Sequence, residues 1–193
     1  LVNSRQSNVV RLVALRKLDG RNQNFIAMIA RNEIDRNIRQ CAVEKVYIGR
    51  QDLLSIIAKT DDYYIIREIA VRKLDSSNQV LLAEIAQNDK FELVQQAALE
   101  KLDGSEEEVQ KILAEIVKHD EDEDIKKQAL DKIDDKVEGA QEILADIVKY
   151  DDVEGEAVNE DIKKQAFEKI SKEIVLGRGI NWDIGKYALL PIL

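Results

Sequence analysis

Two short hydrophobic patterns alternate along this chain. The first pattern consists of an apolar residue, a basic residue or Gln, two variable positions, an Ala, an apolar residue, a variable position, a Lys and an apolar residue, with small departures. It occurs as VRLVALRKL at 10–18, IRQCAVEKV at 38–46, IREIAVRKL at 66–74, VQQAALEKL at 94–102, IKKQALDKI at 125–133 and IKKQAFEKI at 162–170. The central alanines are 28, 28, 28, 31 and 37 residues apart. The pattern therefore defines an internal repeat with a constant period in its first copies and a longer one later.

A second pattern follows each of the first five copies. It begins with Gln and occurs as QNFIAMI at 23–29, QDLLSII at 51–57, QVLLAEI at 79–85, QKILAEI at 110–116 and QEILADI at 141–147. In both patterns the apolar and small residues are three or four positions apart, as at Val10, Val13 and Ala14, so they share one face of a helix. Each repeat is therefore expected to hold two helices of roughly ten residues.

The links between the two patterns contain turn-forming residues, such as Asp19-Gly20 and Asp103-Gly104. We expect each link to join its two helices in a short antiparallel hairpin. Because isolated helices of this length are only marginally stable in water, the hairpins must stack to bury their apolar stripes. The predicted fold class is all-α, a right-handed α-solenoid of about six stacked antiparallel helical hairpins.

The predicted repeat domain covers 1–176. Its repeats lie near 8–35, 36–63, 64–91, 92–122, 123–159 and 160–176. Three residues are added inside hairpins four and five, and six more before the sixth around 154–159, all at turns. After the sixth copy Gly177 and Gly179 interrupt the pattern. We expect 177–193 to be a divergent C-terminal capping segment or a point of truncation, with Trp182 covering the last core layer.

With six Ala-centred copies over nearly its whole length, the chain resembles the HEAT-like helical repeat proteins. Two features depart from the usual HEAT pattern: the 28-residue period is shorter than most, and the proline often seen in the first helix is missing. No subfamily is identified. The resemblance implies that the second helices line a concave face, which is the usual binding surface of such proteins.

The variable positions of the second helices are expected to point away from the core and to form the partner-binding face. They are Asn24, Met28, Arg31, Asp52, Ile56, Lys59, Val80, Glu84, Gln87, Lys111, Glu115, Lys118, Glu142, Asp146 and Lys149. Met28, Ile56 and Val80 would form an apolar patch at the N-terminal end, and exposed apolar residues are typical of a partner site. The opposite end becomes acidic through residues such as Glu115 and Glu142.

Charged residues also recur with the repeat. An acidic residue follows each second helix, at Glu33, Asp61, Asp89, Asp120 and Asp151. A basic residue opens most first helices, at Arg11, Arg39, Arg67, Lys126 and Lys163, with Gln95 in the fourth copy. We interpret the two series as a ladder of ion pairs between repeats rather than as a ligand site, which would tolerate Gln95 poorly.

A Lys closes the first helix and a Gln opens the second. The lysines are Lys17, Lys45, Lys73, Lys101, Lys132 and Lys169, and the glutamines are Gln23, Gln51, Gln79, Gln110 and Gln141. Interaction with the helix dipole and packing of the stem account for the lysines, and the alternative is a row of cations that contacts a polyanion. The glutamines are expected to hydrogen-bond the backbone of the neighbouring turn rather than to recognise a substrate.

Composition agrees with a helical protein, because 35% of the 193 residues are charged and only one is Pro. The apolar stretch from Tyr187 to Leu193 is too short to cross a bilayer. The missing initiator Met indicates a mature, trimmed or excised fragment. The single Cys, Cys41, fits a reducing compartment, so we expect a cytoplasmic protein.

The charge is distributed unevenly. Residues 1–73 hold 14 Lys and Arg against 8 Asp and Glu, and the remaining residues hold 15 against 30. Ten of the eleven Arg residues lie in the first part. An alternative function is therefore nucleic-acid binding or processing through the Arg-rich N-terminal half, with Arg31 and Lys59 in one positive groove.

Candidate chemistry for catalysis is sparse. The only His, His119, lies at a helix end beside Asp120, and Cys41 occupies a core-facing position, so neither is expected to react. The acidic residues at 120, 122 and 124 resemble a calcium loop, but Ile125 stands where the loop needs Gly. A pigment lyase of the HEAT-like kind would need a site that no motif identifies. We therefore predict a non-catalytic scaffold with no cofactor and no metal site. Its expected partner is another protein or peptide, with no membrane association and an unknown oligomeric state.

Overall fold

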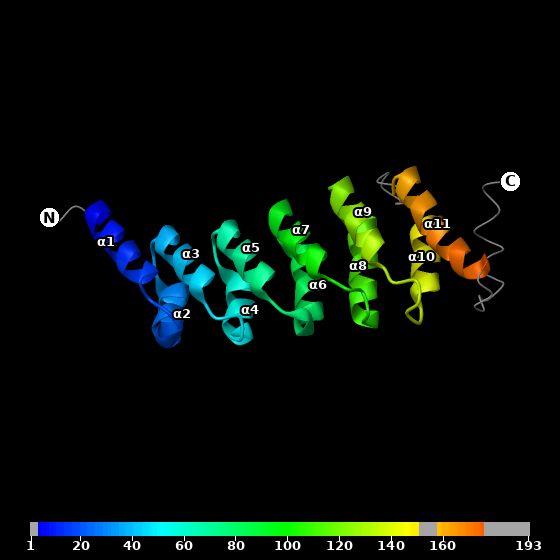
Figure 1. Cartoon of the computed structure of the whole chain (residues 1–193). Helices are drawn as coiled ribbons and strands as arrows, with labels where there is room; N and C mark the ends of the chain where they lie inside the picture. The colour runs from blue at the N-terminus through cyan, green and yellow to red at the C-terminus, as the bar shows by residue number, and fades with distance from the viewer. Residues whose placement is uncertain (1–3, 151–157, 176–193) are drawn as a thin grey trace. The chain divides into compact units, whose positions relative to one another are not determined.

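The computed structural model describes residues 4–150 and 158–175, and these residues contain eleven α-helices, two short 3-10 helices and no β-strand (Figure 1). The helices are α1 (Ser4–Arg16), α2 (Gln23–Asn32), α3 (Arg36–Lys45), α4 (Gln51–Thr60), α5 (Tyr64–Lys73), α6 (Gln79–Asn88), α7 (Glu92–Lys101), α8 (Glu107–His119), α9 (Glu123–Lys132), α10 (Ala140–Lys149) and α11 (Glu160–Val175). The 3-10 helices span Gly20–Asn22 and Ser76–Asn78. The predicted all-α class is confirmed.

Each hydrophobic pattern of the sequence coincides with one helix. The Ala-centred pattern lies in the odd-numbered helices, and the Gln-led pattern lies in the even-numbered ones. Local capping explains where several helices begin. The Asp35 carboxylate accepts hydrogen bonds from the backbone N–H groups of Asn37 (2.9 Å) and Ile38 (3.2 Å) at the start of α3, and Asp122 caps α9 in the same way. The expected short helices are therefore present.

The chain forms two compact units, Leu1–Leu81 and Leu82–Leu193. In the first unit, α1 packs on α3 and α3 on α5, while α2 contacts α4. In the second unit, α7 packs on α9, α9 on α11 and α8 on α10. Within each unit the odd-numbered helices thus form one layer and the even-numbered helices a second layer (Figure 1).

The helices that run closest together are not the two helices of one expected hairpin. They are an even-numbered helix and the odd-numbered helix after it: α2 with α3, α4 with α5, α8 with α9, and α10 with α11. Link length explains the first three pairs, because only three residues separate the helices, as at 33–35, whereas longer links such as 17–22 join α1 to α2. The repeat ranges derived from the sequence stay a prediction.

The core of each unit lies between the two layers. Ala42 and Ala70 in the first unit and Ala98 and Ala129 in the second are fully buried, so the odd-numbered helices approach one another closely. From the even-numbered helices, leucines such as Leu54 are also fully buried. Burying one such Leu contributes about 1.5–3 kcal/mol relative to leaving it exposed. The period of the sequence therefore matches the period of the core.

Some expectations lie outside the described residues. These are Asp151 of the acidic series, the larger part of the insertion around 154–159, and the segment 177–193 with Trp182. Within the described residues, none of the helices combines the length and the apolar character needed to cross a bilayer.

Candidate binding surface

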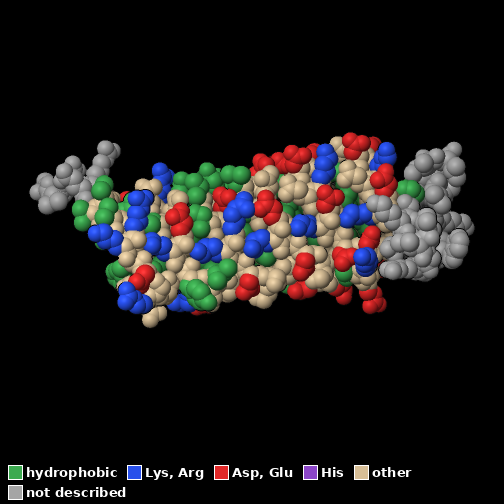
Figure 2. All heavy atoms as spheres, viewed as in Figure 1, with side chains coloured by type: hydrophobic (Ala, Val, Ile, Leu, Met, Phe, Trp, Pro, Cys, Tyr) green, Lys and Arg blue, Asp and Glu red, His purple; other side chains and the backbone are tan. Residues whose placement is uncertain are grey.

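The fifteen predicted site residues lie on the five even-numbered helices, and none of them is buried. Val80, Glu84 and Lys118 are partly exposed, and the other twelve are exposed. On the face drawn in Figure 2, acidic side chains gather over the second unit and hydrophobic side chains are more frequent over the first. The burial pattern thus agrees with the helix phase used for the prediction, while the binding role itself stays a prediction.

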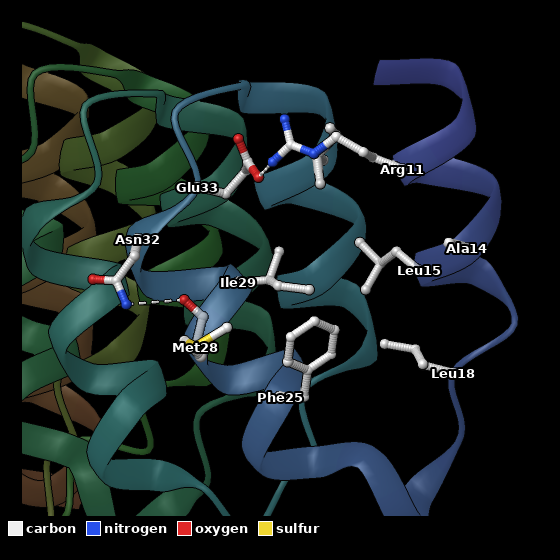
Figure 3. A pocket seen from close by; sticks show the side chains of 10 residues that line it. Arg11, Ala14, Leu15, Leu18, Phe25, Met28, Ile29, Asn32 and Glu33 are labelled. Carbon is white, nitrogen blue, oxygen red and sulfur yellow. Dashed lines mark hydrogen bonds and ion pairs between the residues drawn. The ribbon is translucent and has the colours of Figure 1, made fainter. Parts of the chain in front are cut away.

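In the first unit two of these residues are exposed apolar side chains. Met28 on α2 is 51% exposed and Ile56 on α4 is 44% exposed. Met28 lines a groove of about 460 Å³ with Phe25 from α2 and with Ala14, Leu15 and Leu18, which come from α1 and the residues after it (Figure 3). Phe25 is itself exposed, although its position in the Gln-led pattern predicts a core residue. No signal in the pattern marks this difference.

A second groove of about 400 Å³ lies between the C-terminal ends of α2 and α4. Arg31, Ile56 and Thr60 line it, and Arg39 from α3 contributes to its wall. Of these, Arg31 and Ile56 belong to the predicted site. Glu33, Asp61 and Asp62 also line the groove, and their carboxylates pair with Arg11 and Arg39. The groove therefore combines an exposed apolar side chain, the cation of Arg31 and carboxylates that already have partners.

The second unit contains a polar groove of about 380 Å³ between α6 and α8. Gln87 and Glu115 of the predicted site line it, together with His119. Nearby, the Lys118 ammonium lies 3.6 Å from the Glu115 carboxylate and 3.5 Å from that of Asp146 on α10. Three predicted site residues are thus brought together in one charge cluster, which neutralises part of the acidic end.

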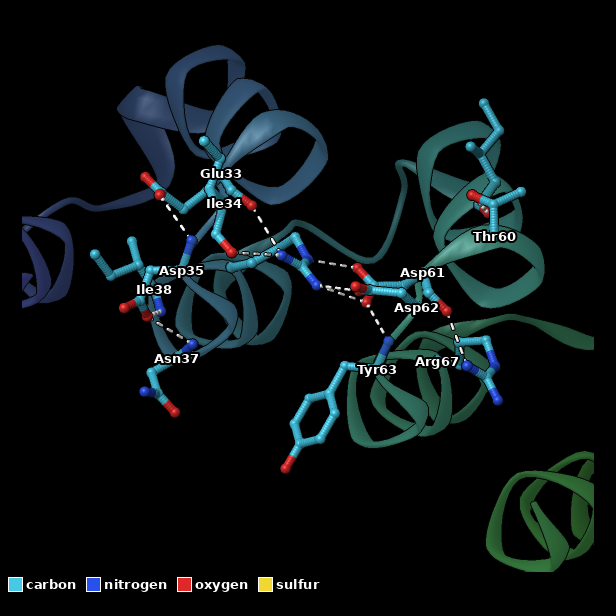
Figure 4. A network of polar contacts seen from close by, with 12 residues as sticks. Glu33, Ile34, Asp35, Asn37, Ile38, Thr60, Asp61, Asp62, Tyr63 and Arg67 are labelled. Carbon is cyan, nitrogen blue, oxygen red and sulfur yellow. Dashed lines mark hydrogen bonds and ion pairs between the residues drawn. The ribbon is translucent and has the colours of Figure 1, made fainter. Parts of the chain in front are cut away.

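The expected ion-pair ladder is present in the first unit (Figure 4). Arg11 pairs with Glu33, and the buried Arg39 donates to both carboxylate oxygens of Asp61, at 2.6 and 3.0 Å. Arg39 also donates to the backbone carbonyl of Glu33 at 2.8 Å. Hydrogen bonding to Asp61 raises the pKa of the Arg39 guanidinium above its ordinary value, although burial opposes this. Arg67 donates to the Asp61 carbonyl at 2.8 Å, which continues the ladder.

The ladder changes character in the second unit. The Gln95 amide occupies the position of the basic residue and donates to the Asp120 carboxylate at 3.3 Å. The Lys126 ammonium lies 3.4 Å from Glu123, and that of Lys163 lies 3.9 Å from Glu160, on their own helices. Asp151, the expected ladder partner of Lys126, lies outside the described residues. Gln95 therefore preserves the geometry of the ladder without its charge.

The recurring lysines interact with a neighbouring helix. The Lys45 ammonium donates to the Leu18 carbonyl at 3.1 Å, and the Lys73 ammonium to the Glu44 carbonyl at 2.7 Å. In the second unit, Lys132 donates to the carbonyls of Glu100 and Leu102, and Lys169 to those of Asp131 and Ile133. Burial lowers the pKa of Lys73, while Glu44 opposes this change. Each lysine thus caps the C-terminal end of the preceding odd-numbered helix, and this role accounts for these four cations without a polyanion.

The recurring glutamines bond to backbone turns, as expected. Gln23 donates to the Lys45 carbonyl at 3.1 Å and accepts from the Tyr47 N–H at 2.6 Å. Gln51 makes the same two contacts with Lys73 (3.2 Å) and Asp75 (3.0 Å). Gln110 instead donates to the Gly104 carbonyl of its own link, and its Oε1 is buried with no partner among the described residues. These side chains therefore connect successive turns of the backbone.

Cys41 and His119 are the two residues whose reactivity the sequence raises. Cys41 is a buried free thiol, as predicted. His119 is exposed at the end of α8, and its ring packs edge-on against Tyr150 with the centroids 5.3 Å apart. Its Nδ1 lies 3.3 Å from the Tyr150 hydroxyl, a contact that the sequence did not reveal. Within residues 4–150 and 158–175, no group of three His, Cys, Asp or Glu side chains is placed to hold a metal ion.

The sequence repeats and the helix packing are the features that can be compared with those of known proteins. No protein-family model, no curated protein and no solved structure matches it. The HEAT-like resemblance therefore rests on the six Ala-centred copies and stays a prediction.

Proposed function

We propose that this chain is a HEAT-like, right-handed α-solenoid of about six hairpins that acts as a non-catalytic scaffold. Its partner is a polypeptide that binds to the exposed surface of the even-numbered helices. The six Ala-centred copies of the sequence support the solenoid, as do the two helical layers within each unit. The surface is the one defined by the fifteen predicted site residues.

The exposed apolar side chains of the first unit carry the proposal. Met28 and Ile56 occupy corresponding positions on α2 and α4, and both are exposed, whereas their neighbours Ala27 and Ile57 are buried. The exposure is therefore specific to one helix face and is repeated after 28 residues. Apolar side chains that recur on one exposed face are typical of a site that a partner covers.

The surrounding charges indicate what the partner presents. Arg31 lies beside Ile56 in the groove between α2 and α4, and it has no ion-pair partner among the described residues. A partner with an apolar side chain next to a carboxylate would complement this groove. In the second unit the site is polar, and Lys118 is already paired there. The first unit is therefore the expected anchor point.

Nucleic-acid binding has weaker support, because many cations of the N-terminal half have acidic or backbone partners. Ion pairs with Asp or Glu involve Arg11, Arg21, Arg39, Arg50 and Arg72. Lys45 and Lys73 donate to helix carbonyls. Binding a phosphate backbone depends on cations that are available to replace its counterions.

The experiment is an affinity capture from an extract of the source cells with three forms of the chain. These are the natural chain, a double variant with Met28→Glu and Ile56→Glu, and a control with Ile34→Glu. Ile34 is almost fully exposed in the link between α2 and α3, so the control introduces one Glu away from the even-numbered helices. Because all three side chains are exposed, thermal unfolding should show little change in stability.

The supporting outcome is a protein that the natural chain and the Ile34→Glu control retain and the double variant loses. Direct binding with the purified partner should then show at least about a tenfold loss of affinity for the double variant. Recovery of nucleic acid that is released by salt and is indifferent to all three substitutions would contradict the proposal.

A further inference from the structure

The first odd-numbered helix, α1, exposes the residues that are buried in every other copy of its pattern. Val10 is 68% exposed, whereas its counterpart Ile38 on α3 is 3% exposed. The other counterparts, Ile66, Val94, Ile125 and Ile162, are fully buried. Ala14 is also exposed, although its five counterparts are fully buried. These residues lie on the face of α1 that does not pack on α3, which we call the N-terminal face of α1. Its side chains are apolar, as in a protein core, but they are exposed to solvent.

The groove of about 460 Å³ lies beside this face, between α1 and α2 (Figure 3). Ala14, Leu18 and Phe25 line it. Phe25 is exposed, whereas its counterpart on α4, Leu53, is buried and those on α6, α8 and α10 are only partly exposed. The unpartnered area therefore extends from α1 onto α2, as a face would if another pair of helices were to pack on it.

Lys17 indicates what kind of element fits this face. Its counterparts Lys45, Lys73, Lys132 and Lys169 each donate to carbonyls at the C-terminal end of the preceding odd-numbered helix. Lys17 is exposed and makes no such bond within the described part of the chain. If another helix lay on α1 in the way that α1 lies on α3, the Lys17 ammonium would reach the last backbone carbonyls of that helix.

Charge and helix ends argue against a second copy of this chain as the occupant. The charged side chains of α1 are three arginines, and although Arg11 pairs with Glu33, the helix itself carries no acidic residue that a second copy of α1 could use to offset their repulsion. In α11, the carbonyls that correspond to those bound by the lysines are at Glu168 and Ile170. Because α11 continues to Val175, these carbonyls accept hydrogen bonds inside the helix and are not free for Lys17.

We propose that the N-terminal face of α1 is a docking surface for a helix from outside residues 1–193 that carries the Ala-centred pattern. The docked helix lies along α1 with its apolar stripe on Val10 and Ala14. The last backbone carbonyls of the docked helix, which have no hydrogen-bond partner within that helix, accept a hydrogen bond from the Lys17 ammonium. The face of α1 adjoins the surface of the fifteen predicted site residues, because Met28 of that surface lines the groove between α1 and α2.

The test attaches a helix with the Ala-centred pattern to the chain, at the spacing that the repeat predicts. In a fused chain, a copy of residues 36–63 replaces residues 1–7 directly before Asn8, which places the copied Ala42 28 residues before Ala14. Val10→Asp and Lys17→Met are then introduced separately into the natural and the fused chains. Arg16→Met is the matched control, because Arg16 and its counterparts, such as Glu44, are exposed.

The change in Tm that each substitution causes should differ between the natural chain and the fused chain. Val10→Asp should lower the Tm of the natural chain by less than about 2 °C and that of the fused chain by more than about 5 °C. Lys17→Met should leave the natural chain unchanged and lower the Tm of the fused chain by about 2–4 °C. Arg16→Met should change neither chain.

Two outcomes would overturn the proposal. One is that Val10→Asp and Lys17→Met have equal effects in the two chains, because the copied helix would then not lie on α1. The other is a natural chain that self-associates with rising concentration in light scattering and becomes monomeric with Val10→Asp. That result would assign the face to a second copy.

Discussion

Arg39 on α3 and Asp61, just after α4, are joined by two hydrogen bonds, from Nε to Oδ2 at 2.6 Å and from Nη2 to Oδ1 at 3.0 Å. Only 10% of the Arg39 side chain and 6% of the Asp61 side chain are exposed. Asp61 also accepts a hydrogen bond from the Tyr63 N–H at 2.9 Å, at the start of α5. This pair therefore ties α3 to the link that leads into the next odd-numbered helix.

Replacing Arg39 by Met should lower the free energy of unfolding by about 3 kcal/mol. The substitution keeps much of the stem but leaves the Asp61 carboxylate buried without its cation. Arg21→Met is the control, because the Arg21–Asp19 pair is exposed and should contribute little to the free energy of unfolding. Urea unfolding of the three proteins measures the difference, and equal losses for both substitutions would refute a special role for the buried pair.

Replacing Gln95 by Arg should stabilise the second unit by about 1 kcal/mol. Gln95 already donates to Asp120 from the ladder position, and a charged donor to a carboxylate is stronger than a neutral one. The gain should disappear when Asp120→Asn is introduced as well, which a double-mutant cycle measures through the unfolding midpoint. A gain that persists without the Asp120 carboxylate would show that the new Arg acts elsewhere.

Replacing glycines by Ala should give a graded series. Gly104 has φ +69°, and an added Cβ would lie 2.1 Å from the Lys132 carbonyl oxygen, so Gly104→Ala should cost about 3 kcal/mol or more. Gly139 has φ +82° but no such overlap, so its replacement should cost only about 1–2 kcal/mol. Gly20 has neither constraint and should tolerate Ala. Chemical unfolding ranks the three, and a different order would contradict the geometry of the Gly104 link.

The stabilising effect of Asp103 should depend on pH. The Ser105 N–H (3.0 Å) and hydroxyl (2.7 Å) donate to its carboxylate and hold the pKa of Asp103 below its ordinary value. Because the folded state favours the ionised form, the contribution is present above the ordinary pKa and is lost as the pH falls through the lowered one. The stability difference between the natural chain and Asp103→Ala should therefore narrow below about pH 4.

Urea unfolding at several pH values measures this effect, which should be small because the side chain is exposed. Ser105→Ala is the control, since it removes one donor and should bring the pKa of Asp103 closer to its ordinary value. A difference between the natural chain and Asp103→Ala that is independent of pH would assign the role of Asp103 to packing.

Several features could be read from the sequence because they depend on local spacing. Both hydrophobic patterns coincide with helices, since residues three and four apart share a helix face whatever lies around them. The ion pair of Arg39 and Asp61 could be anticipated because both residues keep a constant offset from the repeat. The burial of Cys41 followed from its place in the pattern.

Other features depend on neighbours that the pattern does not identify. The sequence pattern predicts that the lysines interact with the ends of their own helices, yet Lys45 and Lys73 bind carbonyls of the preceding odd-numbered helix. The contact of Lys118 with Asp146 joins two helices across a link whose path no local rule specifies. The need for Gly at position 104 arises from the Lys132 carbonyl, which approaches from the next odd-numbered helix.

The helices, their apolar faces and their period can be read from the sequence, because they follow from side-chain spacing along a single chain. Which of those faces are covered depends on how the helices pack. Val10 and Ile38 occupy the same position of the same pattern, yet one is 68% exposed and the other 3%. The physical reason is that burial requires a neighbour: α1 packs on α3, and within the described residues no helix packs on the far side of α1.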